Sequence, residues 1–320
     1  MAPSVSVCGS TSIDLADGRI ECSLCPIRCK LREGQRGRCM ARYSDGQSIL
    51  LEAPQISSAA IEPIEKKPLY HYKPNLRTLS FGGYGCNMSC DFCQNWMVSQ
   101  EKPSDLMDGY QLISMAREHE CDALCMTYNE PLIYFEFLDF LRQSWDQDLV
   151  IKTNAYCEAD PWSEVCDWVD AMNIDWKGSE ARYRAVAKTD GATTLRRIEE
   201  ALAASVHVEI SVPVYLDGED DEYLDFADWL SSLDRSTPIH LLKLFPAFRN
   251  VSQPATPDKK ISRIRDAMLE RLDYVYAHNI FGEAGREMKR TICRSCGQKI
   301  ADRTGLRTEF SVCGCGTIRT

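Results

Sequence analysis

Apolar residues follow two different periods along the middle of the chain, and the two periods alternate. Short runs rich in aliphatic and aromatic side chains predict seven strands, at residues 76–85, 122–128, 149–154, 171–176, 207–215, 239–246 and 274–280. Between them apolar residues recur every three or four positions, which predicts helices at residues 109–120, 131–145, 161–171, 194–206, 221–233 and 262–272. Strands separated by amphipathic helices form a parallel sheet. This α/β pattern suits a doubly wound sheet or a partial barrel, and both place function at the carboxyl ends of the strands.

Cysteines divide the 320-residue chain into three parts, for which we expect the boundaries 1–75, 76–280 and 281–320. Twelve of the 16 cysteines are grouped: Cys8, Cys22, Cys25, Cys29 and Cys39; Cys86, Cys90 and Cys93; Cys293, Cys296, Cys313 and Cys315. No apolar run is long enough to span a membrane and the chain does not start with a signal-peptide pattern, so we expect a cytoplasmic protein. In a reducing compartment, grouped cysteines bind metals more often than they form disulfides. The other four, Cys121, Cys125, Cys157 and Cys166, are expected to be buried thiols.

The net charge of −10 comes from the middle of the chain. Residues 76–280 carry 35 acidic and 19 basic side chains, whereas residues 1–75 and 281–320 are slightly positive. Such a chain lacks the basic surface that binds phosphate backbones, so nucleic acid is an unfavourable partner. The simplest interpretation of the acidic middle is a solvated surface.

Three cysteines after the first predicted strand indicate a reactive iron–sulfur site. In GYGCNMSCDFCQNW, Cys86, Cys90 and Cys93 are spaced C-x3-C-x2-C. A cubane cluster has four irons, so three thiolates from one loop leave one iron open to another ligand. A structural zinc site is the alternative, and it would need a distant fourth ligand.

With Phe92 in the aromatic position, this motif resembles C-x3-C-x-aromatic-C, the signature of the radical S-adenosylmethionine superfamily. The resemblance implies a partial (β/α)6 barrel, related to the TIM barrel, with small cysteine-rich appendages at both ends. It also implies a [4Fe–4S] cluster whose open iron is chelated by the amino and carboxylate groups of S-adenosylmethionine. Reductive cleavage of that cofactor would give a 5′-deoxyadenosyl radical, which makes Cys86, Cys90 and Cys93 catalytic residues.

Further short motifs narrow the resemblance. EKKPLYHYKP, TYNEP, IKTNAY, MNIDWKG and CRSCG are similar to the branch related to pyruvate formate-lyase activating enzyme, and especially to the radical enzyme of the AmmeMemoRadiSam system. The chain departs from that branch at Asn75, where glycine is usual, and in its final CGC, where C-x2-C is usual.

The resemblance also implies which residues bind the cofactor. Glu130 would accept the ammonium group of the methionine moiety, with Thr127 and Asn129 beside it. The alternative for Glu130 is a cap on the helix that begins at Pro131. Asn154, Asp175 and Lys177 would contact the cofactor from the next two strand ends, where ordinary turn chemistry is the alternative. Other side chains that could line the mouth are Lys152, Ser211, Pro213, His240, Lys243, Asn279 and His71.

The N-terminal cysteines Cys22, Cys25, Cys29 and Cys39, spaced C-x2-C-x3-C-x9-C, can complete a tetrahedral metal site. Their spacing allows a structural zinc ion or an electron-relay iron–sulfur cluster. Six basic residues surround them: Arg28, Lys30, Arg32, Arg36, Arg38 and Arg42. Around a relay cluster, this rim could dock an acidic ferredoxin or flavodoxin, although a solvated loop is the simpler interpretation.

The C-terminal set, Cys293, Cys296, Cys313 and Cys315, resembles a zinc ribbon or rubredoxin knuckle, and we expect zinc ahead of iron. This segment should stabilise the fold and could cover the barrel mouth.

Two classes of function compete. The first is a radical enzyme, of oxidoreductase or activating-enzyme type, that abstracts hydrogen from a protein or small-molecule substrate; within it, a glycyl-radical-enzyme activase is the alternative. The second is a non-catalytic iron–sulfur or zinc protein for electron transfer or scaffolding. A pure relay would saturate every iron, so the three-cysteine set favours the enzyme.

Overall fold

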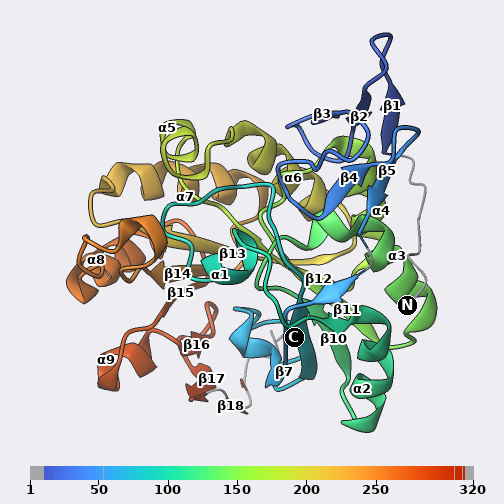
Figure 1. Cartoon of the computed structure of the whole chain (residues 1–320). Coiled ribbons are helices and arrows are strands. Elements are labelled where there is room, and N and C mark those ends of the chain that lie inside the picture. The colour runs from blue at the N-terminus through green and yellow to red at the C-terminus, as the bar shows by residue number, and fades with distance from the viewer. Residues whose placement is uncertain (1–10, 53, 306, 312, 314–320) are drawn as a thin grey trace.

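The computed structural model describes residues 11–313 except 53, 306 and 312 (Figure 1). Its centre is an eight-stranded sheet in the order β15-β14-β13-β12-β11-β10-β8-β7. The strands are β7 (Ser58–Pro63), β8 (Arg77–Gly82), β10 (Ala123–Met126), β11 (Asp148–Thr153), β12 (Ala171–Asp175), β13 (His207–Val214), β14 (Ile239–Lys243) and β15 (Val275–His278). All neighbours are parallel except β7, which pairs antiparallel with β8. The seven predicted strands are therefore confirmed, and β7 was not predicted.

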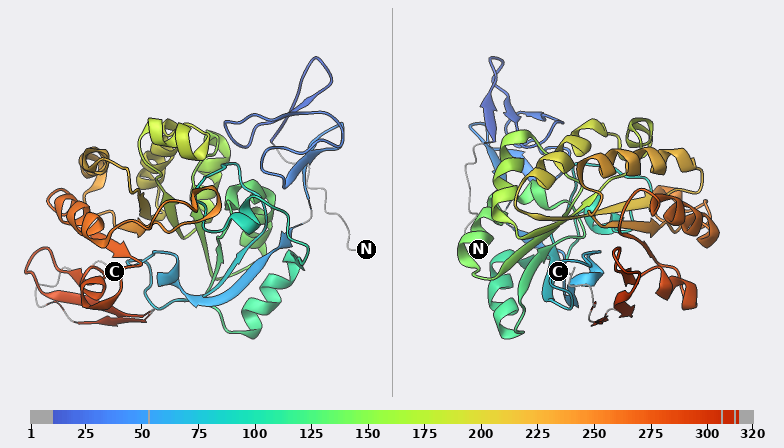
Figure 2. Two further views of the ribbon diagram at one scale, coloured as in Figure 1. Left: turned by 60° about the vertical axis from the view of Figure 1, so that its left-hand side comes forward. Right: turned by 180° about the vertical axis from the view of Figure 1, so that it is seen from behind.

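The order of the strands decides between the two predicted architectures. A doubly wound sheet reverses its strand order at a switch point, whereas here the parallel strands follow one another in chain order. With right-handed crossovers, this order keeps all connecting helices on one face. Six strand–helix units followed by β15 form the expected partial barrel (Figure 2).

The described residues form the six predicted helices, with ends shifted by at most four residues, and three short helices that were not predicted (Trp96–Ser99, Glu180–Arg182 and Gly282–Glu287). In chain order the helices are α1 (Trp96–Ser99), α2 (Leu112–Glu118), α3 (Phe135–Ser144), α4 (Ala159–Trp168), α5 (Glu180–Arg182), α6 (Ala192–Ala203), α7 (Asp220–Asp234), α8 (Asp258–Met268) and α9 (Gly282–Glu287). Short turns are η1 (Ile64–Lys66), η2 (Gly109–Gln111), η3 (Pro131–Tyr134), η5 (Phe248–Asn250) and the π-helical η4 (Tyr183–Ala187). None of the described helices is long and apolar enough to cross a membrane.

Along β13, alternate residues face the apolar outer layer and a polar part of the barrel interior. On β13, Ile210, Val212 and Val214 belong to the main apolar core, which also holds helix residues such as Trp162 and Leu230. The intervening Glu209 and Ser211 are equally buried but face polar partners inside the barrel. Burial of polar groups is tolerable there because they are hydrogen-bonded to one another.

The N-terminal segment forms small antiparallel sheets fastened to the barrel. They comprise β1 (Ser12–Asp14), β2 (Ile20–Cys22) and β3 (Lys30–Leu31), the pair β4 (Arg42–Ser44) and β5 (Ile49–Leu51), and β6 (Gln55–Ile56) with β9 (Met107–Asp108). Arg42 forms a buried two-pronged ion pair with Glu136 of α3, both contacts being 2.6 Å. Arg28 pairs with Glu158 after β11 (2.8 Å). These contacts fix the segment over the barrel.

The C-terminal strands β16 (Thr291–Ile292), β17 (Lys299–Thr304) and β18 (Arg307–Phe310) lie away from β1–β5, at the opposite end of the molecule (Figures 1 and 2). Arg303 stacks over Tyr70 at 4.0 Å and donates to its carbonyl oxygen. Thr308 bonds Asn75 and Glu65. The adjoining cavity is lined by residues that precede β13, β14 and β15, so this segment sits at the amino ends of the strands. The expectation that it covers the mouth is wrong.

Asn75 stands where the resembling branch usually has glycine, and its backbone conformation shows why asparagine is accommodated there. Its φ is +68°, in the left-handed region that glycine adopts freely and that asparagine tolerates. Its side chain then accepts from the amide of Thr308 (2.7 Å) and donates to the carbonyl of that residue (2.9 Å).

Candidate active site

Glycines shape the loop that follows β8 because the backbone packs closely there. A Cβ atom at Gly83 would lie 2.4 Å from the ring of Tyr134. One at Gly85, whose φ is +82°, would lie 1.9 Å from the carbonyl oxygen of Cys39. Neither position has room for a side chain, so glycine is required for the chain to turn into the cysteine loop.

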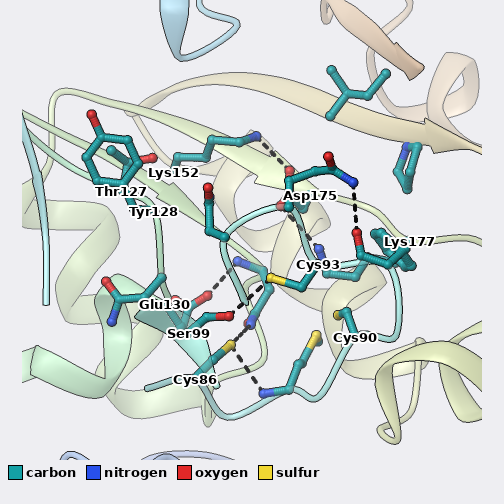
Figure 3. A pocket seen from close by; sticks show the side chains of 18 of the residues that line it. Cys86, Cys90, Cys93, Ser99, Thr127, Tyr128, Glu130, Lys152, Asp175 and Lys177 are labelled. Atoms are coloured by element: carbon teal, nitrogen blue, oxygen red, sulfur yellow. Dashed lines mark hydrogen bonds and ion pairs between the residues drawn. The ribbon is translucent and has the colours of Figure 1, made fainter. Parts of the chain in front are cut away.

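The loop presents Cys86, Cys90 and Cys93 to one cavity of about 280 Å³ (Figure 3). The amide of Met88 donates to Cys86 Sγ (3.4 Å), and Ser99 Oγ hydrogen-bonds Cys93 Sγ (3.1 Å). Burial raises the pKa of Cys90 to about 11 and that of Cys86 well above its ordinary value, so a metal is needed to hold them as thiolates. Three thiols, hydrogen bonds to the sulfurs and an adjoining cavity fit a cluster with one open iron.

Neighbouring elements hold the cysteine loop in place. Asn87 donates to the carbonyl oxygen of Tyr156 (2.8 Å) and accepts from Asn154 Nδ2 (2.9 Å). The amides of Ser89 and Asp91 donate to carbonyl oxygens of the π-helical turn η4. The loop is thus tied to the strand ends that line the rest of the cavity.

Glu130 lies at the end of β10 and is buried, with 2% of its surface exposed. Its carboxylate accepts from the amide of Leu132 (3.0 Å), the hydroxyl of Thr153 (2.6 Å) and the amide of Asn154 (2.8 Å). Burial nevertheless raises the pKa of Glu130 to about 7. The cap on the helical turn at Pro131 is therefore real, and the carboxylate also lines the cavity.

Charged residues from β11 and β12 form a second group on the cavity wall. Lys152 Nζ contacts Asp175 (2.6 Å), Asn173 (2.5 Å) and Ser211 (3.0 Å), and Lys177 Nζ contacts Asp175 at 3.1 Å. Burial alone would raise the pKa of Asp175, but the two ammonium groups outweigh it and hold this pKa at about 2. The wall therefore carries two cations around one carboxylate.

The cavity brings together every predicted central-site residue: Cys86, Cys90, Phe92, Cys93, Thr127, Asn129, Glu130, Asn154, Asp175 and Lys177. Lys152, Pro213, Lys243 and Asn279 also line it. Ser211, His240 and His71 do not. They lie deeper in the barrel, where Glu209 bonds His240 (2.6 Å) and the amide of His71 (2.7 Å).

Sequence reasoning missed three kinds of residue at this site. Ser99 reaches Cys93 from α1, Tyr128 lines the cavity in a left-handed conformation (φ +69°), and Gln94 donates to the carbonyl oxygen of Phe245 (3.2 Å). Their contacts depend on the course of the loop in space, and no local pattern signals it.

The flanking cysteine sets each converge. Cys22, Cys25, Cys29 and Cys39 line a single small cavity of about 20 Å³. The sulfurs of Cys293, Cys296 and Cys313 lie within 4.8 Å of one another, as ligands of one metal ion would. Cys8 and Cys315 lie outside the described residues.

A partial barrel with a three-cysteine loop after its first parallel strand defines a class of enzymes that use an iron–sulfur cluster for radical chemistry. Residues 81–230 match the Radical SAM superfamily. The chain belongs to this superfamily and is a radical SAM enzyme. Such enzymes use a [4Fe–4S] cluster and S-adenosylmethionine, require a reductant and act on a substrate.

The chain is also similar to a curated protein and, in fold, to solved structures. It is 33% identical over 301 residues to the uncharacterized protein MJ0808 of Methanocaldococcus jannaschii, covering 90% of this chain and 89% of that protein. Among solved structures, SuiB of Streptococcus suis bound to the precursor peptide SuiA gives a TM-score of 0.51 at 9% identity, covering 71% of this chain and 54% of SuiB. SuiB bound to S-adenosylmethionine gives 0.50 at 10% identity, covering 68% and 53%. The chain spans about half the length of SuiB, and the likeness shows a shared fold.

Proposed function

We propose that Cys86, Cys90 and Cys93 hold a [4Fe–4S] cluster whose open iron binds S-adenosylmethionine, and that the enzyme abstracts hydrogen from a protein or small-molecule substrate. The observation that carries this proposal is the single cavity shared by the three thiols and the polar ends of β10, β11 and β12. When bound and reduced, the cluster supplies the electron that cleaves the sulfonium to methionine and a 5′-deoxyadenosyl radical.

The remaining residues bind and orient the cofactor. Glu130 offers a buried carboxylate to the ammonium group of the methionine moiety, and Lys177 offers a cation to its carboxylate. Asp175 and Asn154 hydrogen-bond the ribose and the methionine moiety from adjacent strand ends. The pair of Lys152 and Asp175 keeps the wall polar and fixed before the cofactor arrives, which limits the entropy lost on binding.

The motifs that resemble the branch of pyruvate formate-lyase activating enzyme fit two kinds of enzyme, a modifying enzyme and an activase. A modifying enzyme would change the mass of its protein or small-molecule substrate. An activase would leave a radical on a glycine of its partner, visible by electron paramagnetic resonance. Incubation of the reduced enzyme with candidate partners, read out by both mass and spin, distinguishes them.

Replacing Glu130 by glutamine should weaken S-adenosylmethionine binding about ten- to a hundredfold, because a charge-assisted hydrogen bond is worth about 1.5–3 kcal/mol. Glutamine keeps the size of the side chain and an oxygen that can cap Leu132. The measurement is equilibrium binding to the reconstituted protein, with Glu199→Gln on the exposed face of α6 as the control of equal charge change. Unchanged affinity combined with a lower unfolding midpoint would assign Glu130 to capping alone.

We propose that the C-terminal cysteines bind zinc. Cys296 Sγ and Cys313 Sγ are 3.4 Å apart, near the roughly 3.8 Å edge of a tetrahedron around one ion with metal–sulfur bonds of about 2.3 Å. The segment 281–320 is then a zinc-stabilised unit beside the barrel of 76–280, with 1–75 as the third unit.

Cys296→Ser should lower bound zinc from about one equivalent to near zero while leaving cluster iron unchanged. Cys296 is exposed, so the substitution itself disturbs little packing. Metal analysis of the full chain measures both quantities. Loss of iron together with zinc would show that this site supports the central cluster.

A further inference from the structure

We propose that the N-terminal cysteines Cys22, Cys25, Cys29 and Cys39 hold a second [4Fe–4S] cluster, with all four irons ligated by protein, which passes electrons to the central site. The presence of this cluster is independent of the proposed function. Only its relay role depends on that function.

The local fold directs four sulfurs into one space. Cys22 ends β2 and its amide donates to the carbonyl oxygen of Cys29 across the hairpin (2.9 Å), while Cys25 lies in the connecting loop. Arg28 and Met40, each adjacent to one of the cysteines, adopt left-handed conformations with φ of +50° and +66°. Such conformations cost energy for residues with a side chain, and they persist where the surrounding structure requires them. Here they turn Cys29 and Cys39 toward the shared cavity.

The spacing of the sulfurs separates zinc from a cluster. Around one zinc ion, sulfurs bonded at about 2.3 Å lie roughly 3.8 Å apart. Across the described residues, the C-terminal triad is the sole group of three Cys, His, Asp or Glu ligand atoms that lie within 4.8 Å of one another. No three sulfurs of the N-terminal set lie within 4.8 Å of one another, although all four cysteines line one cavity. The sulfurs of the central triad, which belongs to the superfamily's cluster site, likewise do not all lie within 4.8 Å of one another.

A cubane cluster accounts for this wider arrangement. Each thiolate binds a different iron at a corner of the cube, so the four sulfurs stand farther apart than around a single ion. The lining suits a cluster as well: Leu24, Ile27, Leu31 and Ile133 supply an apolar wall. The amide of Arg38 donates to Cys29 Sγ (3.4 Å), a contact of the kind that tunes the potential of cluster sulfurs.

Consecutive residues line the two cysteine sites. Cys86 lines the central cavity, and the next residue, Asn87, lines the N-terminal one. Asn154 Nδ2 touches both, at 2.9 Å from Asn87 Oδ1 and 3.7 Å from Cys86 Sγ. The carbonyl of Cys39 packs so closely on Gly85 that a Cβ there would lie 1.9 Å from it. An electron can therefore pass over a short path of packed and hydrogen-bonded groups.

The outer side of the site fits a negatively charged electron donor. Lys30, Arg32, Arg36 and Arg38 are exposed around the hairpin of a chain whose middle is acidic. A one-electron carrier protein of the ferredoxin or flavodoxin class, with an acidic surface, would be steered to this rim. The carrier is oxidised by one electron, which the N-terminal cluster accepts and passes on, and no bond or proton moves in that step.

Iron content of the full-length chain, reconstituted without oxygen, tests the second cluster. We expect about eight irons in the wild type, and about four in both Cys86→Ala/Cys90→Ala/Cys93→Ala and Cys25→Ala/Cys29→Ala. Cys166→Ala, which removes a cysteine outside the three sets, should keep all eight. A wild type with about four irons and two zinc ions overturns the proposal, as does a triple variant without iron.

Spectroscopy separates the two clusters in the same samples. The reduced signal of the triple variant should not respond to S-adenosylmethionine because its cluster has no open iron. The reduced signal of Cys25→Ala/Cys29→Ala should shift when the cofactor is added. A cofactor-sensitive signal from the N-terminal cysteines contradicts complete ligation by protein. If the proposed function is wrong, the signal of the central cluster will not respond to S-adenosylmethionine, while the iron of the N-terminal cluster is still present.

The relay role predicts a reductant-dependent defect. In Cys25→Ala/Cys29→Ala, 5′-deoxyadenosine formation with reduced flavodoxin should fall at least about tenfold more than with dithionite. A small chemical reductant can reach the central cluster directly, whereas the protein carrier docks at the basic rim. Equal losses with both reductants overturn the relay role, and a zinc site that only supports folding predicts that result.

Discussion

Replacing Cys86, Cys90 and Cys93 together by alanine should abolish reductive cleavage of S-adenosylmethionine, a loss of more than about a thousandfold. In the proposed site each cysteine supplies one of three protein ligands to the central cluster, and the loop contains no further thiol that could replace it. Each single substitution should also remove most of the activity, since a cluster held by two thiolates is labile. The measurement is 5′-deoxyadenosine and methionine released by the reduced protein.

Cys166→Ala is the matched control for this experiment. Cys166 lies on α4, outside the central cavity, and its loss should leave cleavage intact. If the triple variant still forms 5′-deoxyadenosine at the wild-type rate, the cluster that cleaves the cofactor is bound elsewhere, and the assignment of the central site is wrong.

The sequence predicted the parallel strands because each is a short run of apolar residues between helical periods. It could not choose between a doubly wound sheet and a partial barrel, since strand order is a property of the whole fold. Strand β7 was not predicted because Ser58–Pro63 is half-buried, lacks a strong apolar run and ends in proline. Its place is set by pairing with β8, for example Ile61 with Leu79.

That the candidate residues line one cavity was predictable because they follow strands, and the carboxyl ends of parallel strands meet. The contacts that these residues make with one another were not predictable. Glu130 gains Thr153 and the amide of Asn154 as partners only when β10 and β11 are side by side. His240 seemed to belong to the mouth, yet its place early in β14 puts it in the deeper layer beside Glu209.

The N- and C-terminal segments show the same limit. Their cysteine spacings predicted metal sites, but their docking depends on single long-range contacts that no local pattern reveals. Arg42 was interpreted as part of a solvated basic rim, whereas its side chain is 1% exposed and pairs with Glu136. Arg303 joins the C-terminal strands to Tyr70 at the amino ends of the barrel strands, away from the mouth.

Arg42→Met should destabilise the protein by about 3–5 kcal/mol because it leaves the carboxylate of Glu136 buried without a partner. The guanidinium donates to both carboxylate oxygens at 2.6 Å, to Thr11 Oγ1 at 2.7 Å and to the carbonyl oxygen of Ile133 at 3.3 Å. Methionine fills similar space but satisfies none of these acceptors. The free energy of unfolding in urea, followed by tryptophan fluorescence at matched metal content, measures the loss.

The double variant Arg42→Met/Glu136→Met separates the two causes of that loss. It removes both charges, so it should recover a large part of the stability, because the main cost is the unpaired carboxylate and not the missing attraction. Arg42→Lys should fall between the wild type and Arg42→Met, since it keeps the charge without the planar fork. A loss below about 1 kcal/mol for Arg42→Met would match an exposed ion pair and would show that the N-terminal segment is not held on α3 as described.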